Sequence, residues 1–210
     1  NFRVNKYRNF ALMSISNEKH LVEALKNSDQ KAFKEIVNTY QTRVYNTCYG
    51  LLQDQYAAQD ISQDVFIELF KSVHKFREES KLSTWLYRIA INKSLNHLRD
   101  HKKHRLVRSI ERFFTQSEEA ESLQIEDSSS LNSQQLYEQN DHAMALQKAL
   151  SKLPINQRTA FVLKNYDDLS YKEIEEVMGL SLSSVESLIH RARLNLQKSL
   201  QDYYQENFLR

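Results

Sequence analysis

The chain has 210 residues, of which 40% are hydrophobic and 27% are charged, and it contains only two glycines, one proline and one cysteine. So little glycine and proline argues against β-hairpins and sandwiches and favours long helices. A single cysteine leaves no disulfide within the chain and no cysteine-cluster zinc site, and it suits the reducing cytoplasm. No apolar run approaches the length of a membrane span, so membrane insertion is not expected.

The net charge of +2 hides an uneven distribution. Residues 71–108 carry eleven basic and three acidic side chains, whereas residues 109–141 carry one basic and eight acidic side chains. The acidic segment is also rich in Ser, Glu and Gln, a composition typical of a mobile linker. We therefore predict an N-terminal tail, a first domain, an acidic linker and a second domain, at residues 1–17, 18–108, 109–139 and 140–210.

Apolar residues recur at spacings of three and four in both domains, which is the pattern of amphipathic helices. The expected fold class is all-α, with two small helical domains joined by a flexible acidic linker. In the first domain, helices are predicted near residues 18–27, 30–52, 55–74 and 83–105. In the second domain, helices are predicted near residues 142–153, 155–166, 170–178 and 181–204, with a break at Pro154.

The predicted helix at 55–74 carries an acidic stripe. Asp60, Asp64 and Glu68 recur every four residues and so share one helix face, beside an apolar stripe and close to Phe66. An aromatic ring at an acidic edge suits a protein-docking surface. An ordinary amphipathic helix has the same pattern, so the residues alone leave both interpretations open.

The next motif combines a polar loop, residues 77–83, with a row of hydrogen-bond donors. After Trp85, the helix aligns Arg88, Asn92, Asn96 and Arg99 on one face. This combination suits single-stranded nucleic acid, because cations follow the backbone and the loop has room for an unstacked base. The alternative is a solvated basic face.

No metal, cofactor or catalytic site is predicted. His97, His101 and His104 have the spacing of metal ligands, but no carboxylate accompanies them and cationic residues surround them. The two glycines are too far apart for a phosphate-binding loop, and Cys48 lies in an apolar helical pattern typical of a core thiol.

The second domain contains a helix-turn-helix pattern that starts at Tyr171. The positions that require apolar residues hold Ile174, Met178, Leu180, Val185 and Leu188, with Gly179 at the turn. Glu175 stands where a small residue is usual. With Ser181 or Ser183 as N-cap, the second helix would present polar and basic side chains suited to phosphates and base edges. A helical hairpin packed for stability is the alternative interpretation.

Four motifs in this order resemble those of extracytoplasmic-function sigma factors of bacterial RNA polymerase: "QDISQDVFIELF", "STWLYRIAINKSLNHLR", "LSKLPINQRTAFVL" and "LSYKEIEEVMGLSLSSVESLIHRAR". The resemblance covers roughly residues 20–105 and 140–203. Leu82, Asn96, Glu186 and Leu188 depart from residues that are common in the family. These departures concern promoter sequence more than activity.

The resemblance implies three binding surfaces. Docking on the polymerase clamp would use Asp60, Gln63, Asp64 and Phe66. Capture of the melted minus-ten strand would use Lys75, Arg77, Lys81, Ser83, Trp85, Arg88, Asn92, Asn96 and Arg99. Reading of the duplex minus-thirty-five element would use Ser183, Ser184, Glu186, Ser187, His190, Arg191 and Arg193.

The implied function is that of a cytoplasmic promoter-specificity subunit rather than an enzyme. Its partners would be core RNA polymerase and promoter DNA, and an anti-sigma factor is a further expectation from the family. The alternative is a stand-alone helix-turn-helix regulator that dimerises on a palindromic site. That alternative leaves the Trp85 loop and the acidic stripe without a role.

Overall fold

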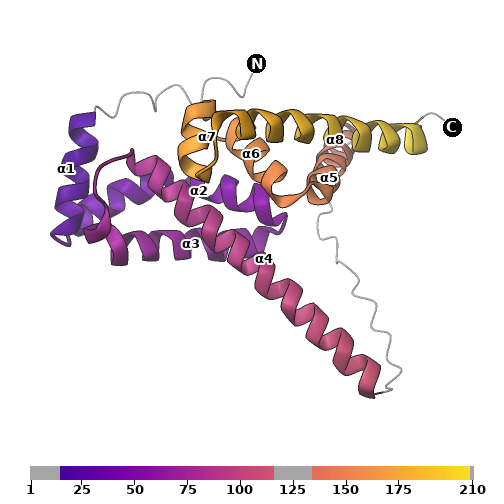
Figure 1. Ribbon diagram of the computed structural model, residues 1–210, viewed down its shortest axis with the longest axis horizontal. Helices are drawn as coiled ribbons and strands as arrows, with labels where there is room; N and C mark the ends of the chain where they lie inside the picture. The colour runs from indigo at the N-terminus through magenta and orange to yellow at the C-terminus, as the bar shows by residue number, and fades with distance from the viewer. Residues whose placement is uncertain (1–14, 116–133, 209–210) are drawn as a thin grey trace.

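The computed structural model describes residues 15–115 and 134–208 as a set of packed helices (Figure 1). No strand occurs within these ranges, which confirms the all-α prediction. The first part contains α1 (Ile15–Lys26), α2 (Gln30–Leu52), α3 (Gln55–Ser72), the short 3₁₀ helix η2 (Val73–Lys75) and α4 (Leu82–Thr115). The second part contains α5 (Gln134–Lys152), α6 (Ile155–Asn165), α7 (Tyr171–Met178) and α8 (Leu182–Phe208).

Local side-chain chemistry sets several of the helix starts. The Asp29 carboxylate accepts hydrogen bonds from the first backbone N–H groups of α2, and Asp54 does the same at α3. At α7, Ser170 and Glu173 form a reciprocal capping box. At α8, the Ser181 hydroxyl accepts a hydrogen bond from the Ser184 N–H, so Ser181 is the N-cap residue.

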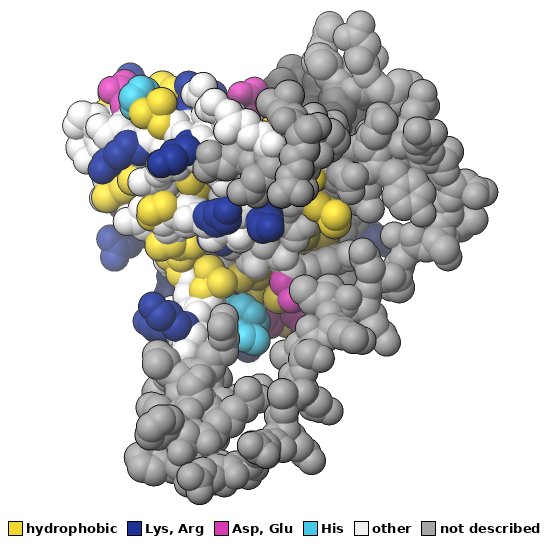
Figure 2. All heavy atoms as spheres, turned by 90° about the vertical axis from the view of Figure 1, so that its right-hand side faces the viewer, with side chains coloured by type: hydrophobic (Ala, Val, Ile, Leu, Met, Phe, Trp, Pro, Cys, Tyr) yellow, Lys and Arg dark blue, Asp and Glu magenta, His cyan; other side chains and the backbone are white. Residues whose placement is uncertain are grey.

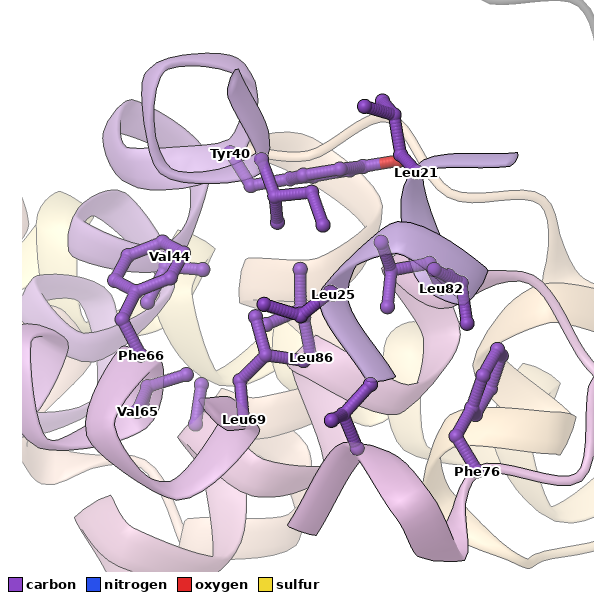
Figure 3. Close-up of a cluster of buried hydrophobic side chains, with 14 of the residues drawn as sticks. Leu21, Leu25, Tyr40, Val44, Val65, Phe66, Leu69, Phe76, Leu82 and Leu86 are labelled. Carbon is purple, nitrogen blue, oxygen red and sulfur yellow. The ribbon is translucent and has the colours of Figure 1, made fainter. Parts of the chain in front are cut away.

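The N-terminal helices enclose one hydrophobic core. Helices α2, α3 and α4 pack on one another, and α1 packs against α2 and η2. Figure 3 shows the centre of this core, where side chains from all four α-helices converge. Its members include Leu21, Leu25, Tyr40, Val44, Val65, Phe66, Leu69, Phe76, Leu82 and Leu86.

The C-terminal part contains the expected helix-turn-helix, formed by α7 and α8. Ile174 and Val185 are fully buried between the helices, and Met178, Leu180 and Leu188 pack against the same cluster. Val177 and Ile189 are also buried there, although the pattern did not single them out. Helix α5 completes this part by packing along α8.

The two parts share a core instead of standing apart. Leu51, Tyr87 and Ile91 of the first part lie in the same buried cluster as residues of α6, α7 and α8. Helix α2 packs on α6, and α4 packs on α7, which lies above α2 and α4 in Figure 1. Gly50 makes the first contact possible, since a Cβ atom there would lie 2.8 Å from both methyl carbons of Val162.

The helix boundaries differ from the sequence prediction mainly around the linker. Helix α4 continues to Thr115, and α5 begins at Gln134, so both extend into the segment expected to be a linker. The middle of that segment, 116–133, and most of the predicted tail lie outside the described residues. Among the helices that are described, none combines the length and hydrophobicity needed to span a bilayer.

The turn between α7 and α8 generates a stability prediction. Gly179 has φ 64° and ψ 33°, and a Cβ atom added there would meet no atom within 4 Å. Substitution therefore costs conformational strain without a clash. We expect Gly179→Ala to lower the free energy of unfolding by about 1–2 kcal/mol, as measured by urea denaturation. Gly179→Asn should cost less, because Asn tolerates this conformation. Equal stability of the Ala and Gly proteins would contradict this account.

Candidate nucleic-acid and polymerase interfaces

The outward face of α3 carries the predicted acidic residues. Asp60, Gln63 and Asp64 are all exposed. Glu68 turns toward α4, where its carboxylate lies 3.6 Å from the Lys93 ammonium. The free acidic surface is therefore shorter than the stripe predicted from spacing.

Phe66 does not belong to this surface. Its side chain is only 7% exposed and lies in the N-terminal core, where Figure 3 shows it beside Val44. The docking role expected for Phe66 is therefore inconsistent with the structure. The reason is the position of Phe66 around the helix axis. Phe66 lies between Val65 and Leu69 on the side of α3 that faces the core.

Other apolar side chains occupy the outward face in its place. Tyr56 is 80% exposed, Ile67 is 50% exposed and Phe70 is 43% exposed. Phe70 is steadied by Phe33 of α2, in an edge-to-face contact with the ring centroids 5.5 Å apart. The sequence prediction did not assign these residues to the docking surface. The spacing of Tyr56 and Ile67 from Asp60, four and seven residues, already placed both on its face, whereas Phe70 lies at the side of that face.

A cavity of about 410 Å³ opens beside the Trp85 loop. The rings of Phe76 and Trp85 stack in its wall, 5.0 Å apart at an angle of 25°. Phe76 is buried and holds the half-buried Trp85 in place. The cavity lining consists of Lys75, Phe76, Arg77, Glu79, Ser80, Trp85, Arg88 and Glu176. Three of the charged lining residues are cations and two, Glu79 and Glu176, are acids. Cations beside an aromatic wall are suited to an unstacked base and its phosphates.

The predicted donor row continues from this cavity along α4. Arg88, Asn92, Asn96 and Arg99 are all exposed on one side of the helix. Helix α4 extends away from the rest of the molecule in Figure 1. Figure 2 views the molecule from the side toward which α4 and α8 run, and Lys and Arg prevail there among the coloured charged side chains.

The C-terminal part engages two of the minus-ten candidates. The Arg88 guanidinium donates two hydrogen bonds to the Glu176 carbonyl of α7, the one from Nε at 3.1 Å. The Lys81 ammonium lies 2.8 Å from the Glu173 carboxylate. Burial raises the pKa of Glu173, but hydrogen bonds from Lys81 and Ser170 outweigh it and bring that pKa to about 2. This ion pair is therefore present throughout the neutral pH range.

The first three turns of α8 expose the predicted reading residues to solvent. The exposed set is Ser183, Ser184, Glu186, Ser187, His190, Arg191 and Arg193. The Arg191 Nε donates to the Ser187 carbonyl at 3.2 Å, which leaves its other donors available. Leu194, which directly follows Arg193, is 52% exposed. Short hydroxyls, an imidazole and guanidiniums on one accessible helix suit a DNA major groove.

The histidines of α4 form a ring contact: the imidazoles of His97 and His101 lie 4.5 Å apart. The side chain of His104 is outside the described residues. Within the part of the chain that the structure describes, no group of three or more potential ligands could hold a metal ion.

Comparison with known proteins agrees with this geometry. Residues 36–104 match the family model of sigma-70 region 2, and residues 143–196 match that of sigma-70 region 4. The chain is 31% identical over 189 residues to the ECF RNA polymerase sigma factor SigW of Bacillus subtilis, covering 88% of this chain and 97% of SigW. It is 29% identical over 199 residues to the RNA polymerase sigma-H factor of Pseudomonas aeruginosa, covering 93% and 100% of the two chains.

Two solved structures share the fold. The complex of CnrH with the cytosolic domain of CnrY matches with a TM-score of 0.62 at 21% identity, covering 88% of this chain and 97% of that chain. The complex of the sigma factor RpoE with the anti-sigma factor NepR from Bartonella quintana matches with a TM-score of 0.58 at 24% identity, covering 81% and 98%.

The matched regions and helices define a sigma factor of bacterial RNA polymerase. Within that class, the chain belongs to the ECF family. It binds core RNA polymerase and promoter DNA, and it directs promoter recognition, DNA melting and transcription initiation. Sigma factors are non-catalytic initiation factors. A stand-alone helix-turn-helix regulator is not favoured, because the region 2 match accounts for the first helical part.

The sole tryptophan of the chain provides a direct test of the cavity. We expect a mixed-sequence single-stranded DNA of about 12 nucleotides to quench Trp85 fluorescence, because a base that enters the cavity stacks on the indole. Arg77→Ala should weaken this binding about tenfold, since it removes a cation from the lining. Lys34→Ala, the same charge change at an exposed site on α2, is the control. Equal losses for both variants would show that the cavity is not the binding site.

Proposed function

We propose that the three surfaces divide the work of a sigma factor. In this proposal residues 18–108 dock on polymerase and capture the minus-ten element, and residues 140–210 read the minus-thirty-five element. The observation that carries the proposal is the Phe76–Trp85 cavity, from which the exposed donor row of α4 begins. A helix-turn-helix alone would have no use for an aromatic cavity that leads into a row of cations and amides.

The docking surface is proposed to be the outward face of α3. Asp60, Gln63 and Asp64 would supply polar contacts, and the exposed Ile67 and Phe70 would supply the apolar ones. Interfaces obtain most of their affinity from a few large apolar or aromatic side chains surrounded by polar ones. The mixed composition of this face fits that pattern better than the acidic stripe alone.

The minus-ten strand is proposed to cross the cavity and follow α4. Trp85 would stack on a base, while Lys75, Arg77 and Lys81 would neutralise phosphates. Ser83 lies at the start of α4, where it lines the neighbouring cavity beside Asp167, and it is proposed to donate to the same strand. Arg88, Asn92, Asn96 and Arg99 would continue the contact along the helix.

We further propose that the chain has no catalytic activity of its own and works in the cytoplasm, where polymerase and promoters are found. An anti-sigma partner is also proposed. Its support is that the two solved structures with the same fold are complexes, one with the cytosolic domain of CnrY and one with the anti-sigma factor NepR. The overall function is tested by transcription in vitro with purified core polymerase and a promoter library. Initiation without sequence selectivity would contradict it.

The α3 surface is tested by binding to purified core polymerase. Ile67→Ala combined with Asp64→Ala should weaken binding about thirtyfold or more and leave the free energy of unfolding nearly unchanged. Phe66→Leu should have the opposite effect, because Phe66 packs in the core. It should lower the free energy of unfolding, while the folded variant binds core polymerase with unchanged affinity. Asp168→Asn, an exposed acid far along the chain, controls for charge. A loss of affinity in Phe66→Leu at full folding would restore Phe66 to the interface.

Arg191 is expected to read or position the minus-thirty-five duplex. In a selection from a randomised promoter library, Arg191→Ala should cost about 1–3 kcal/mol at one base pair if the guanidinium contacts a guanine. A uniform loss across sequences would assign it to a phosphate instead. Gln197→Ala, also exposed on α8 but outside the proposed set, should leave selection unchanged. No change in Arg191→Ala would remove Arg191 from the interface.

A further inference from the structure

The contact between the two helical parts contains a buried acidic group that the promoter-binding role does not use. Asp167 precedes α7 and is only 8% exposed. Its carboxyl group lies against α2 of the first part, where Asp167 Oδ2 is 2.7 Å from the Thr47 hydroxyl oxygen. Thr47 itself is completely buried. The pair therefore joins residues 120 positions apart across the shared core.

The surroundings of Asp167 favour a neutral carboxyl group. Asp167 Oδ1 is buried without a hydrogen-bond partner among the described residues. The Thr47 hydroxyl is also 3.0 Å from the Arg43 carbonyl oxygen, and its one hydrogen can serve only one of these two acceptors. Protonation of Asp167 removes this competition between the two acceptors. The Asp167 O–H then donates to the Thr47 oxygen, and the Thr47 hydroxyl donates to the Arg43 carbonyl.

Several charged or titratable groups face Asp167 from the elements packed around it. Arg43 and Cys48 lie on α2, Tyr87 lies on α4, and Asp168 and Glu173 line the same cavity of about 200 Å³. Burial raises the pKa of Asp167 to about 7, against the hydrogen bond from Thr47, the positive charge of Arg43 and the nearby Tyr87 hydroxyl, which lower it. Glu173 stays ionised beside Lys81, and burial raises the pKa of Cys48 to about 11.

The contact that Asp167 joins also covers promoter-binding residues. In the same arrangement α7 accepts both hydrogen bonds from Arg88 and pairs with Lys81, and Glu176 forms part of the wall of the Trp85 cavity. The reading face of α8 remains exposed. The closed arrangement therefore engages two of the minus-ten candidates, Lys81 and Arg88, and leaves the minus-thirty-five candidates available.

We propose that Asp167 is a proton-dependent latch that holds α7 against the minus-ten face of α4. Protonated Asp167 fits the buried site and keeps the two parts closed. Ionised Asp167 favours separation, which returns its carboxylate to water and releases Arg88 and Lys81. The masking of the minus-ten face rests on the function proposed above for these residues, whereas closure itself is independent of that function.

The direction of the pH effect follows from linkage. The pKa of Asp167 is about 7 in the closed state and should return to about 3.9 when the side chain is in water. The contribution of Asp167 to closure is thus fully present below about pH 4 and is lost as the pH rises to about 7. Over that range the equilibrium constant for opening should rise by up to about tenfold per pH unit, and it should level off above it.

The test measures closure directly by energy transfer between dyes on the full chain. Cysteines introduced at the exposed positions Gln59 and Gln197 carry the dyes, because the buried Cys48 thiol is unreactive. Transfer should fall between about pH 5.5 and about pH 8. Asp167→Asn, which imitates the neutral acid, should stay closed at both pH values. Asp168→Asn, with the neighbouring 98% exposed side chain, should keep the parent's pH profile.

The Gly50→Ala variant serves as the reference for the open state, because its Cβ atom would collide with Val162 and so prevent α2 from packing on α6. Helix α2 itself should still form, since Ala has a higher helix propensity than Gly. The variant should show low transfer at every pH with unchanged helicity by circular dichroism. A parent profile without pH dependence, or the same dependence in Asp167→Asn, would overturn the latch. Unchanged transfer in Gly50→Ala would overturn the assigned closed interface.

Masking is read separately, from binding of a single-stranded DNA of about 12 nucleotides by fluorescence anisotropy. Gly50→Ala should bind several-fold more tightly than the parent at about pH 5.5, and Asp167→Asn more weakly than the parent at about pH 8. If the two parts separate but DNA binding does not change, the minus-ten face is not masked in the closed state. That result would leave the proposed roles in polymerase docking and promoter selectivity unaffected.

Discussion

The close approach of α2 and α6 at Gly50 is the contact on which the arrangement of the two helical parts depends. Because Gly50 has no side chain, Val162 of α6 and Tyr166, the residue after α6, can lie directly on the α2 backbone. The same approach places the buried Arg158 guanidinium on the Leu51 carbonyl, at the negative end of α2. Gln147 of α5 donates to the carbonyl of Gln53, the C-cap residue of α2. The C-terminal part thus caps a helix of the N-terminal part.

This contact makes the three candidate surfaces differ in how accessible they are to a partner. The docking face of α3 and the reading face of α8 point to solvent and need no rearrangement to meet a partner. The minus-ten cavity borders Glu176, and Arg88 already has a protein partner there. Polymerase docking can therefore precede capture of the melted strand. The free energy for separating α7 from α4 would then come from binding, which favours whichever state binds more tightly.

Helix α3 shows how far periodicity can be trusted. Spacing correctly groups Asp60 with Asp64 on one face and Val65 with Leu69 on another. It does not say where the buried sector ends, because α3 is contacted by both α2 and α4 and its core sector is wide. Phe66 falls inside that sector, while Ile67 and Phe70 fall outside it. Whether an aromatic residue beside acidic residues is buried or exposed therefore cannot be predicted until the positions of the neighbouring helices are known.

The sequence by itself determined the all-α class, the helix order and the turn of the helix-turn-helix. These features depend on interactions within a few residues, such as the Ser170–Glu173 capping box and the left-handed backbone of Gly179. Only the tertiary structure decided that Asp167 meets Thr47, that Arg158 meets Leu51, and that α7 lies over Arg88. Such pairs are separated by about 90 to 120 positions. Their contact depends on how closely two helices can approach, a property that no repeat of three or four residues encodes.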